Sequence, residues 1–172
     1  VTALGGWAPP VGIALVADRL SALLLLVSTL VALAVLVYAI SQRIADFGRR
    51  MASSTFYPMY LVLSAGVSLA YLSGDLFTLF VSFEIMLTAS YVLITRRTTT
   101  QTIRAGMTYV TVSLLSSLLF LTAVGMVYAA TATVNLADLS ERVQTLPPGL
   151  RTVLALMLVV VSGIKAAMVP LH

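Results

Sequence analysis

The chain has 172 residues, of which 60% are hydrophobic and 9% are charged, and its formal net charge is +4. Average soluble domains carry about 25% charged residues, so this composition excludes an ordinary water-soluble domain. The sequence contains no cysteine, which excludes disulfides, thiol nucleophiles and thiolate metal sites, and its one histidine, His172, cannot hold a metal ion alone.

Five apolar segments follow one another along the chain, each long enough to cross a bilayer. A spanning helix needs about 20 apolar residues to cross a hydrocarbon core of roughly 30 Å. The predicted spans are residues 20–40, 56–72, 76–95, 105–129 and 151–172. The predicted fold class is therefore an all-α integral membrane protein, a polytopic helix bundle. Because the chain starts without Met and stops inside an apolar run, we expect residues 1–172 to be one fragment of a longer transmembrane domain.

The arginines predict how these spans are oriented. Loops 41–55 and 96–104 fall on one side and together hold six Arg, whereas the two connections on the opposite side, the turn 73–75 and the segment after the fourth span, hold two, Arg142 and Arg151. This excess predicts that loops 41–55 and 96–104 lie on the cytoplasmic side of the cell membrane. Basic residues beside apolar runs, without a basic patch interleaved with aromatics, indicate topology and not nucleic-acid binding.

Two segments between spans have a predicted local structure. In the stretch 131–149, apolar residues at Leu136, Leu139 and Val143 recur at helical spacing among charged residues. This pattern predicts a short helix on the membrane surface. Asp75, in the turn before the third span, is interpreted as a turn or helix N-cap residue in preference to an ion ligand.

Two charges, Glu84 and Lys165, fall well inside predicted spans. Counted along the helices, Glu84 lies about 14 Å from Asp75 and Lys165 about 21 Å from Arg151. A charge at the bilayer centre costs roughly 2.5–3.5 kcal/mol on insertion scales, so it normally faces a partner or a hydrated cavity. The proton affinities of a carboxylate and an amine change with spacing and hydration, which is the property that proton or cation transfer requires. The alternative is a static ion pair that fixes helix register in a structural scaffold.

Other candidate groups lie near these charges in the sequence. Gly163 and Pro170 flank Lys165, so we expect the helix to be interrupted just past the lysine, as in helices that line ion pathways. Weaker pathway candidates are His172, as a proton relay, and the hydroxyls of Thr111, Ser113, Ser116 and Ser117 in the fourth span. Such hydroxyls more often bond back to helix carbonyls or allow close helix packing.

Two motifs resemble those of a known family. One is the segment 74–93, GDLFTLFVSFEIMLTASYVL, and the other is the segment 163–172, GIKAAMVPLH. A third, shorter match is the segment 135–139, NLADL. Together they resemble the antiporter-like membrane subunits shared by respiratory NADH–quinone oxidoreductase and the multisubunit Mrp cation/proton antiporters. The run around Glu84 is most similar to the D subunit of the Mrp antiporters.

This resemblance implies a 14-helix fold with inverted repeats, of which the chain would be the third to seventh helices. It implies Na⁺/H⁺ antiport within a complex of membrane subunits, with Glu84 and Lys165 as the proton or ion pathway. It implies a transporter and not an enzyme, with no metal or redox cofactor. The alternatives are a proton-pumping subunit of a respiratory oxidoreductase complex and a structural membrane scaffold.

Overall fold

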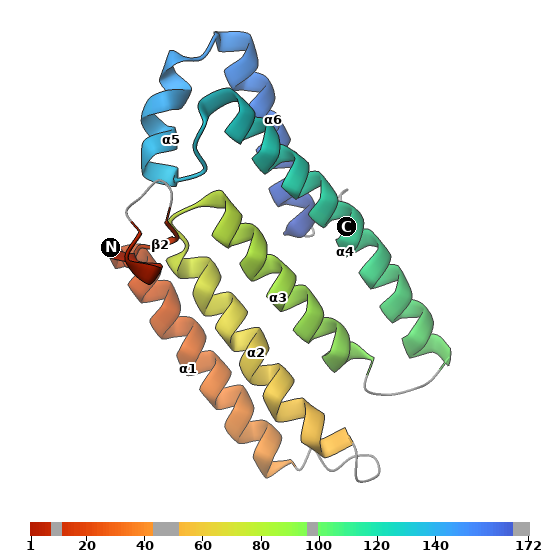
Figure 1. Cartoon of the computed structure of the whole chain (residues 1–172). Coiled ribbons are helices and arrows are strands. Elements are labelled where there is room, and N and C mark those ends of the chain that lie inside the picture. Colours follow the sequence, from red (N-terminus) through yellow and green to blue (C-terminus); the bar gives the residue numbers. More distant parts are fainter. Residues whose placement is uncertain (8–11, 43–51, 96–99, 167–172) are drawn as a thin grey trace. The chain divides into compact units, whose positions relative to one another are not determined.

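A computed structural model of the chain describes residues 1–7, 12–42, 52–95 and 100–166 (Figure 1). Among these residues, five helices are long and apolar enough to cross a membrane. They are α1 (Arg19–Ser41), α2 (Ala52–Leu72), α3 (Leu76–Ile94), α4 (Thr100–Thr131) and α6 (Pro148–Lys165). The predicted all-α membrane fold with five spans is confirmed.

Helix α4 is longer than the predicted span 105–129. It has 32 residues, which corresponds to about 48 Å, whereas the hydrocarbon core is roughly 30 Å thick. The helix therefore continues beyond the apolar residues that identify the span. Hydropathy finds the membrane-crossing part of a helix, but backbone hydrogen bonding decides where the helix begins.

The chain divides into two compact units. One unit consists of Val16–Leu72 and Ser82–Val110, and therefore holds α1, α2 and parts of α3 and α4. The other consists of Val1–Leu15, Ser73–Val81 and the chain from Thr111 onward, and therefore holds the N-terminal segment, the rest of α3 and α4, and α6.

In the first unit, α1 begins at a capping aspartate and is apolar on all sides. The Asp18 carboxylate accepts a hydrogen bond of 2.6 Å from the Ser21 backbone N–H. That hydrogen bond holds the pKa of the Asp18 carboxyl below its usual value of 3.8. Large apolar side chains are exposed over most of the circumference of the helix, among them Leu23, Leu24 and Leu26, and the remaining face, which includes Ala39, is buried or half-buried. A helix of this kind is suited to an apolar surrounding and not to water.

Helix α2 approaches its neighbours closely on both sides. Towards α1, the Tyr60 hydroxyl donates to the Ala32 carbonyl oxygen at 2.7 Å. Towards α3, Gly66 lies so near Met86 that a Cβ at position 66 would stand 2.8 Å from the methionine Cγ. Small residues at helix contacts are typical of membrane bundles, where close backbone approach replaces the hydrophobic drive present in water.

The second unit contains short β-structure that the sequence did not predict. Strand β1 (Thr2–Ala3) pairs antiparallel with β2 (Ala14–Leu15), and the 3-10 turn η1 (Leu4–Gly6) lies between them. Isolated bridges then join Leu15 to Ser73 and Asp75 to Asn135. Strands of two residues are too short to produce an alternating hydrophobic pattern, so only the folded structure reveals them.

The connection between α4 and α6 contains the predicted short helix. It forms α5 (Leu136–Arg142), followed by the 3-10 turn η3 (Val143–Thr145). The Asn135 side chain caps α5 by accepting from the backbone N–H groups of Ala137 and Asp138. Pro148 occupies the first turn of α6, where its missing N–H costs no helical hydrogen bond.

Arg142 ties this connection to the end of α4. Its Nε donates to Asp138 Oδ1 at 2.9 Å and its Nη1 donates to the Thr131 carbonyl oxygen at 3.0 Å. The hydrogen-bonded guanidinium holds the pKa of the Asp138 carboxyl below its usual value of 3.8. The Thr131 carbonyl belongs to the last turn of α4, so Arg142 satisfies an acceptor that the helix leaves open.

Candidate functional site

Lys165 is the last residue of α6. The helix ends there because Ala166 leaves the helical conformation, while its N–H still bonds to the Ser162 carbonyl at 2.9 Å. The expected interruption at Pro170 lies outside the described residues and stays a prediction. Counted along the axis, Lys165 lies about 26 Å from Pro148. The C-terminal end of a helix carries a partial negative charge, which favours a cation at this position.

The amine of Lys165 contacts one of the predicted serines. Its Nζ donates a hydrogen bond of 2.6 Å to the Oγ of Ser117, and the two residues are 48 positions apart in the sequence. Ser117 is on α4 and is 5% exposed, whereas Lys165 is half-buried. The second unit therefore brings together two residues that the sequence singled out for separate reasons.

Ser117 belongs to a buried face of α4 that includes polar residues. Ser113 is half-buried, and Ser116 and Ser117 are buried, at helical positions i, i+3 and i+4. Ser116 Oγ has no hydrogen-bond partner among the described residues. Phe120 continues the same face and stacks on Phe80 of α3, with 6.2 Å between ring centroids. Thr111 is exposed and therefore lies off this face.

Glu84 is on α3, close to the middle of the helix. It lies about 12 Å from Leu76 and about 15 Å from Ile94, and it is half-buried. Its carbonyl oxygen accepts a hydrogen bond of 2.9 Å from the Thr88 hydroxyl. Glu84 belongs to the first unit and Lys165 to the second, so the pairing of the two charges stays a prediction.

Asp75 is confirmed as a capping residue. One carboxylate oxygen accepts from the Thr78 backbone N–H at 2.6 Å, and the other accepts from the Thr78 hydroxyl at 2.7 Å. Both residues are buried, at the start of α3. His172 lies outside the described residues. Within the part of the chain that is described, no group of three His, Cys, Asp or Glu residues is placed to hold a metal ion.

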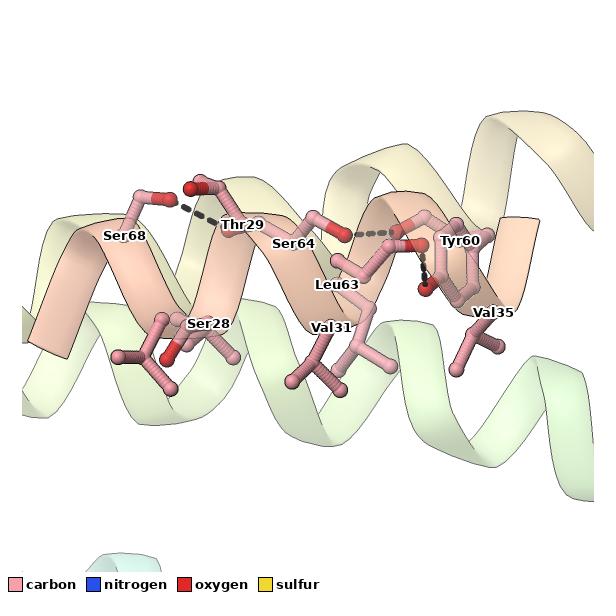
Figure 2. Close-up of a pocket in the computed structure, with 11 residues that line it drawn as sticks. Ser28, Thr29, Val31, Val35, Tyr60, Leu63, Ser64 and Ser68 are labelled. Atoms are coloured by element: carbon pink, nitrogen blue, oxygen red, sulfur yellow. Dashed lines mark hydrogen bonds between the residues drawn. The ribbon is translucent and has the colours of Figure 1, made fainter. Parts of the chain in front are cut away.

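A groove of about 320 Å³ lies between α1 and α2 in the first unit (Figure 2). Its hydroxyl groups bond within the two helices: Ser64 donates to the Tyr60 carbonyl at 3.0 Å and Ser68 to the Ser64 carbonyl at 2.9 Å. The Ser28 hydroxyl donates to the Tyr71 hydroxyl at 3.1 Å. Because these groups are satisfied locally, the groove presents apolar surface and no group that binds an ion.

Five helices of this length and apolar composition define a polytopic membrane protein. The family described as "NADH:quinone oxidoreductase/Mrp antiporter", in its transmembrane part, matches residues 73–172, which is more than half of the chain. The chain belongs to this family.

Curated relatives support the same family. The D subunit of the Na(+)/H(+) antiporter of Bacillus subtilis is 39% identical over 170 residues, which are 98% of this chain and 34% of that protein. The D subunit of the probable K(+)/H(+) antiporter of Rhizobium meliloti is 40% identical over 171 residues, with 98% and 31% covered. These relatives are named as antiporter subunits, which are transporters and not enzymes. The resemblance to the D subunit is confirmed, and the chain spans about one third of the relatives' length.

Two solved structures are similar in fold. A chain of the Mrp complex from Dietzia superposes with a TM-score of 0.82 at 34% identity, covering 99% of this chain and 31% of that chain. A chain of the membrane-bound sulfane sulfur reductase, an archaeal respiratory membrane complex, superposes with a TM-score of 0.83 at 26% identity, covering 99% and 34%. Chains of similar fold therefore occur both in an Mrp complex and in a respiratory complex.

Proposed function

We propose that this chain is part of the D subunit of a Mrp-type antiporter, which exchanges Na⁺ for H⁺ across the cell membrane together with other membrane subunits. The observation that carries the proposal is the Lys165 amine, which lies at the end of a membrane-spanning helix and is hydrogen-bonded to a buried serine of another. The names of the relatives support the transported ions and the multisubunit assembly.

In this proposal Lys165 and Glu84 exchange protons along a hydrated path inside the bilayer. An amine and a carboxylate are costly when charged in an apolar surrounding, so small changes of hydration or spacing change which protonation state is preferred. A coupled change of this kind is what links proton movement to cation movement. The Lys165 amine has a hydroxyl partner from α4, and the Glu84 carboxylate sits near the middle of α3.

The test uses the full-length protein in its complete complex, in everted membrane vesicles. Glu84→Gln keeps the side-chain shape but removes the titrating group, and Lys165→Ala removes the amine. Each should reduce Na⁺-driven proton exchange by about 100-fold or more, in the range of a lost acid or base group, at unchanged complex yield. Glu141→Gln, which neutralises an exposed carboxylate on α5, is the matched control and should transport normally. Normal exchange by Glu84→Gln at normal yield would refute the mechanism.

A second candidate is a proton-pumping subunit of a respiratory complex. The observation that favours it is the fold similarity to the archaeal sulfane sulfur reductase complex. The two functions differ in what drives the ions. Proton exchange that follows an imposed Na⁺ or K⁺ gradient without an electron donor supports the antiporter. Exchange that requires an electron donor supports the respiratory complex, and comparing Na⁺ with K⁺ identifies the cation.

The orientation is a further part of the proposal. The arginine excess predicts that the loops preceding α2 and α4 face the cytoplasm. Residues 1–172 contain no cysteine, so each introduced cysteine adds one labelling site, which is compared with the unsubstituted protein. Both Ser140 on α5 and Gln101 at the start of α4 are exposed, so a difference in labelling reports the side of the membrane. A membrane-impermeant thiol reagent added to intact cells should label Ser140→Cys but not Gln101→Cys. External labelling of Gln101→Cys would refute the orientation.

A further inference from the structure

We propose that Ser117 is a positioning residue for Lys165, whose hydroxyl keeps the amine hydrogen-bonded before and after it releases a proton. This inference rests on the proposed function, because it assigns Ser117 a role in the same proton path. It starts from a contact of 2.6 Å between Lys165 Nζ and Ser117 Oγ, which joins α6 to α4 within one unit.

The chemistry of the two groups makes a serine suited to this role. An ammonium group has three N–H donors and no acceptor, so it must donate to the serine oxygen. A neutral amine has a lone pair, to which the serine O–H can donate after the hydroxyl rotates. A neutral amine also keeps two N–H groups, so the serine hydroxyl can either accept from it or donate to it, and neither protonation state loses this partner. A carbonyl acceptor would bind only the N–H groups, and an apolar residue would bind neither state.

Burial makes this partner matter. Ser117 is 5% exposed, so little solvent reaches its hydroxyl. The half-buried amine therefore has a protein partner at a place where water does not easily replace the hydroxyl. The adjacent Ser116 is as buried but has no partner among the described residues, so burial of a hydroxyl on α4 does not by itself bring it to the amine. The contact is specific to position 117.

The end of α6 adds a second influence on the same amine. Lys165 is the last residue of α6, and the C-terminal end of a helix carries a partial negative charge that attracts a cation. The serine hydroxyl favours the ammonium too, because hydrogen bonds with a charged partner are stronger than neutral ones. Loss of the hydroxyl is thus expected to remove one stabilising hydrogen bond from the ammonium form of Lys165.

The test compares two variants of nearly equal shape, Ser117→Thr and Ser117→Val, in the full-length protein within its complex. Threonine keeps the hydroxyl and valine replaces it with a methyl group. Na⁺-driven proton exchange is measured against pH in everted vesicles, with complex yield measured in parallel. We expect Ser117→Thr to stay within about twofold of the wild type. We expect Ser117→Val to lose about fivefold or more at neutral pH and to move its half-maximal pH down by about one unit, which is the value of one charged hydrogen bond.

Two further variants make the outcome decisive. Ser117→Ala repeats the loss of the hydroxyl without added bulk and should behave like Ser117→Val, even if threonine and valine both lower the yield. Thr122→Ala removes an exposed α4 hydroxyl that bonds to the Leu118 carbonyl, and its pH profile should not move. A wild-type pH profile in Ser117→Ala, with Lys165→Ala inactive, overturns this inference alone. Normal transport in Lys165→Ala overturns the proposed function itself.

Discussion

The α1–α2 pair and the α4–α6 pair differ in the hydrogen-bond partners of their polar side chains. Between α1 and α2, most serine and threonine hydroxyls bond to carbonyls of their own helices, as Thr29 does to Leu25 and Ser64 to Tyr60, and Ser28 bonds to another hydroxyl, that of Tyr71. In the α4–α6 pair, a hydroxyl on one helix meets an amine on the other. A hydroxyl that bonds to its own helix is compatible with surrounding lipid, whereas an amine needs a partner from elsewhere. A hydroxyl inside a span is therefore weak evidence for function, whereas an amine that bonds to another helix is stronger evidence.

The largest effect that sharpens this comparison is expected for Lys165→Arg. Guanidinium keeps the charge but does not release its proton under these conditions, so Na⁺-driven exchange should fall by about 100-fold at normal complex yield. Arg151→Gln, a change of an exposed cation at the other end of α6, should leave exchange within about twofold. If Lys165→Arg transports like the wild type, Lys165 is a static ion-pair partner and the scaffold interpretation gains support.

A charge placed in the middle of α1 tests the apolar side of the comparison. Leu30 is the midpoint of Arg19–Ser41 and is 58% exposed. Leu30→Asp should cost roughly 2.5–3.5 kcal/mol of insertion free energy, because α1 offers no partner to a carboxylate there. Quantitative immunoblotting of the membrane fraction should show a strong loss of the protein. Ser41→Asp, at the end of the same helix, should be tolerated, and equal yields of the two variants would contradict the expectation.

Close packing of α2 on α3 predicts a moderate effect. A Cβ at Gly66 would stand 2.8 Å from Met86 Cγ and 3.1 Å from Ile85 Cγ2. Gly66→Val should therefore destabilise the protein by about 1–3 kcal/mol through overpacking. Gly125→Val on α4 is the control, since a Cβ at Gly125 meets nothing within 4 Å. Thermal unfolding of the purified complex in detergent should separate the two variants, and equal midpoints would contradict the predicted contact.

Removing the hydroxyl of Tyr60 should have a small effect that is confined to stability. Tyr60→Phe deletes the donor to the Ala32 carbonyl, and interhelical hydrogen bonds in membrane proteins contribute about 0.6 kcal/mol on average. The unfolding midpoint should decrease slightly while Na⁺-driven exchange stays unchanged. Tyr128→Phe changes an exposed tyrosine and serves as the control. A large loss of transport in Tyr60→Phe would mean that the α1–α2 groove has a role in the ion path.

The smallest effect concerns pH and the connection between α4 and α6. Arg142 holds the pKa of Asp138 below its usual value of 3.8, so the carboxylate stabilises the folded protein above that value. This contribution is lost as the pH falls from about 5 through the folded-state pKa. Asp138→Asn should remove this contribution. The unfolding midpoint of the variant should therefore decrease less between pH 5 and pH 3 than that of the wild type. An identical pH dependence in the two proteins would exclude the Arg142 contact as its source.

Most residues of the candidate site could be predicted from the sequence, but the sequence signals for them differ in strength. Glu84 and Lys165 are conspicuous because they interrupt apolar runs, and Asp75 because it precedes a helix. Ser117 was one of four hydroxyls of equal standing in the fourth span. Nothing in the residue type or its spacing distinguishes it from Ser116, since the distinguishing feature is an amine 48 residues away.

The sequence by itself determined that this is a membrane protein and that the described residues form five helices able to cross a bilayer. Apolar length decides whether a segment crosses a bilayer, and this property is additive along the chain, so it can be counted without knowing the fold. Tertiary structure alone decided which polar groups meet. The bridge of Asp75 to Asn135, the contact of Arg142 with the end of α4, and the selection of Ser117 by Lys165 each join segments that local sequence treats as independent. Such contacts depend on how the helices pack in three dimensions. A hydrogen bond forms only when the donor and acceptor atoms are placed to within a few tenths of an ångström, and helical periodicity does not specify their positions that closely.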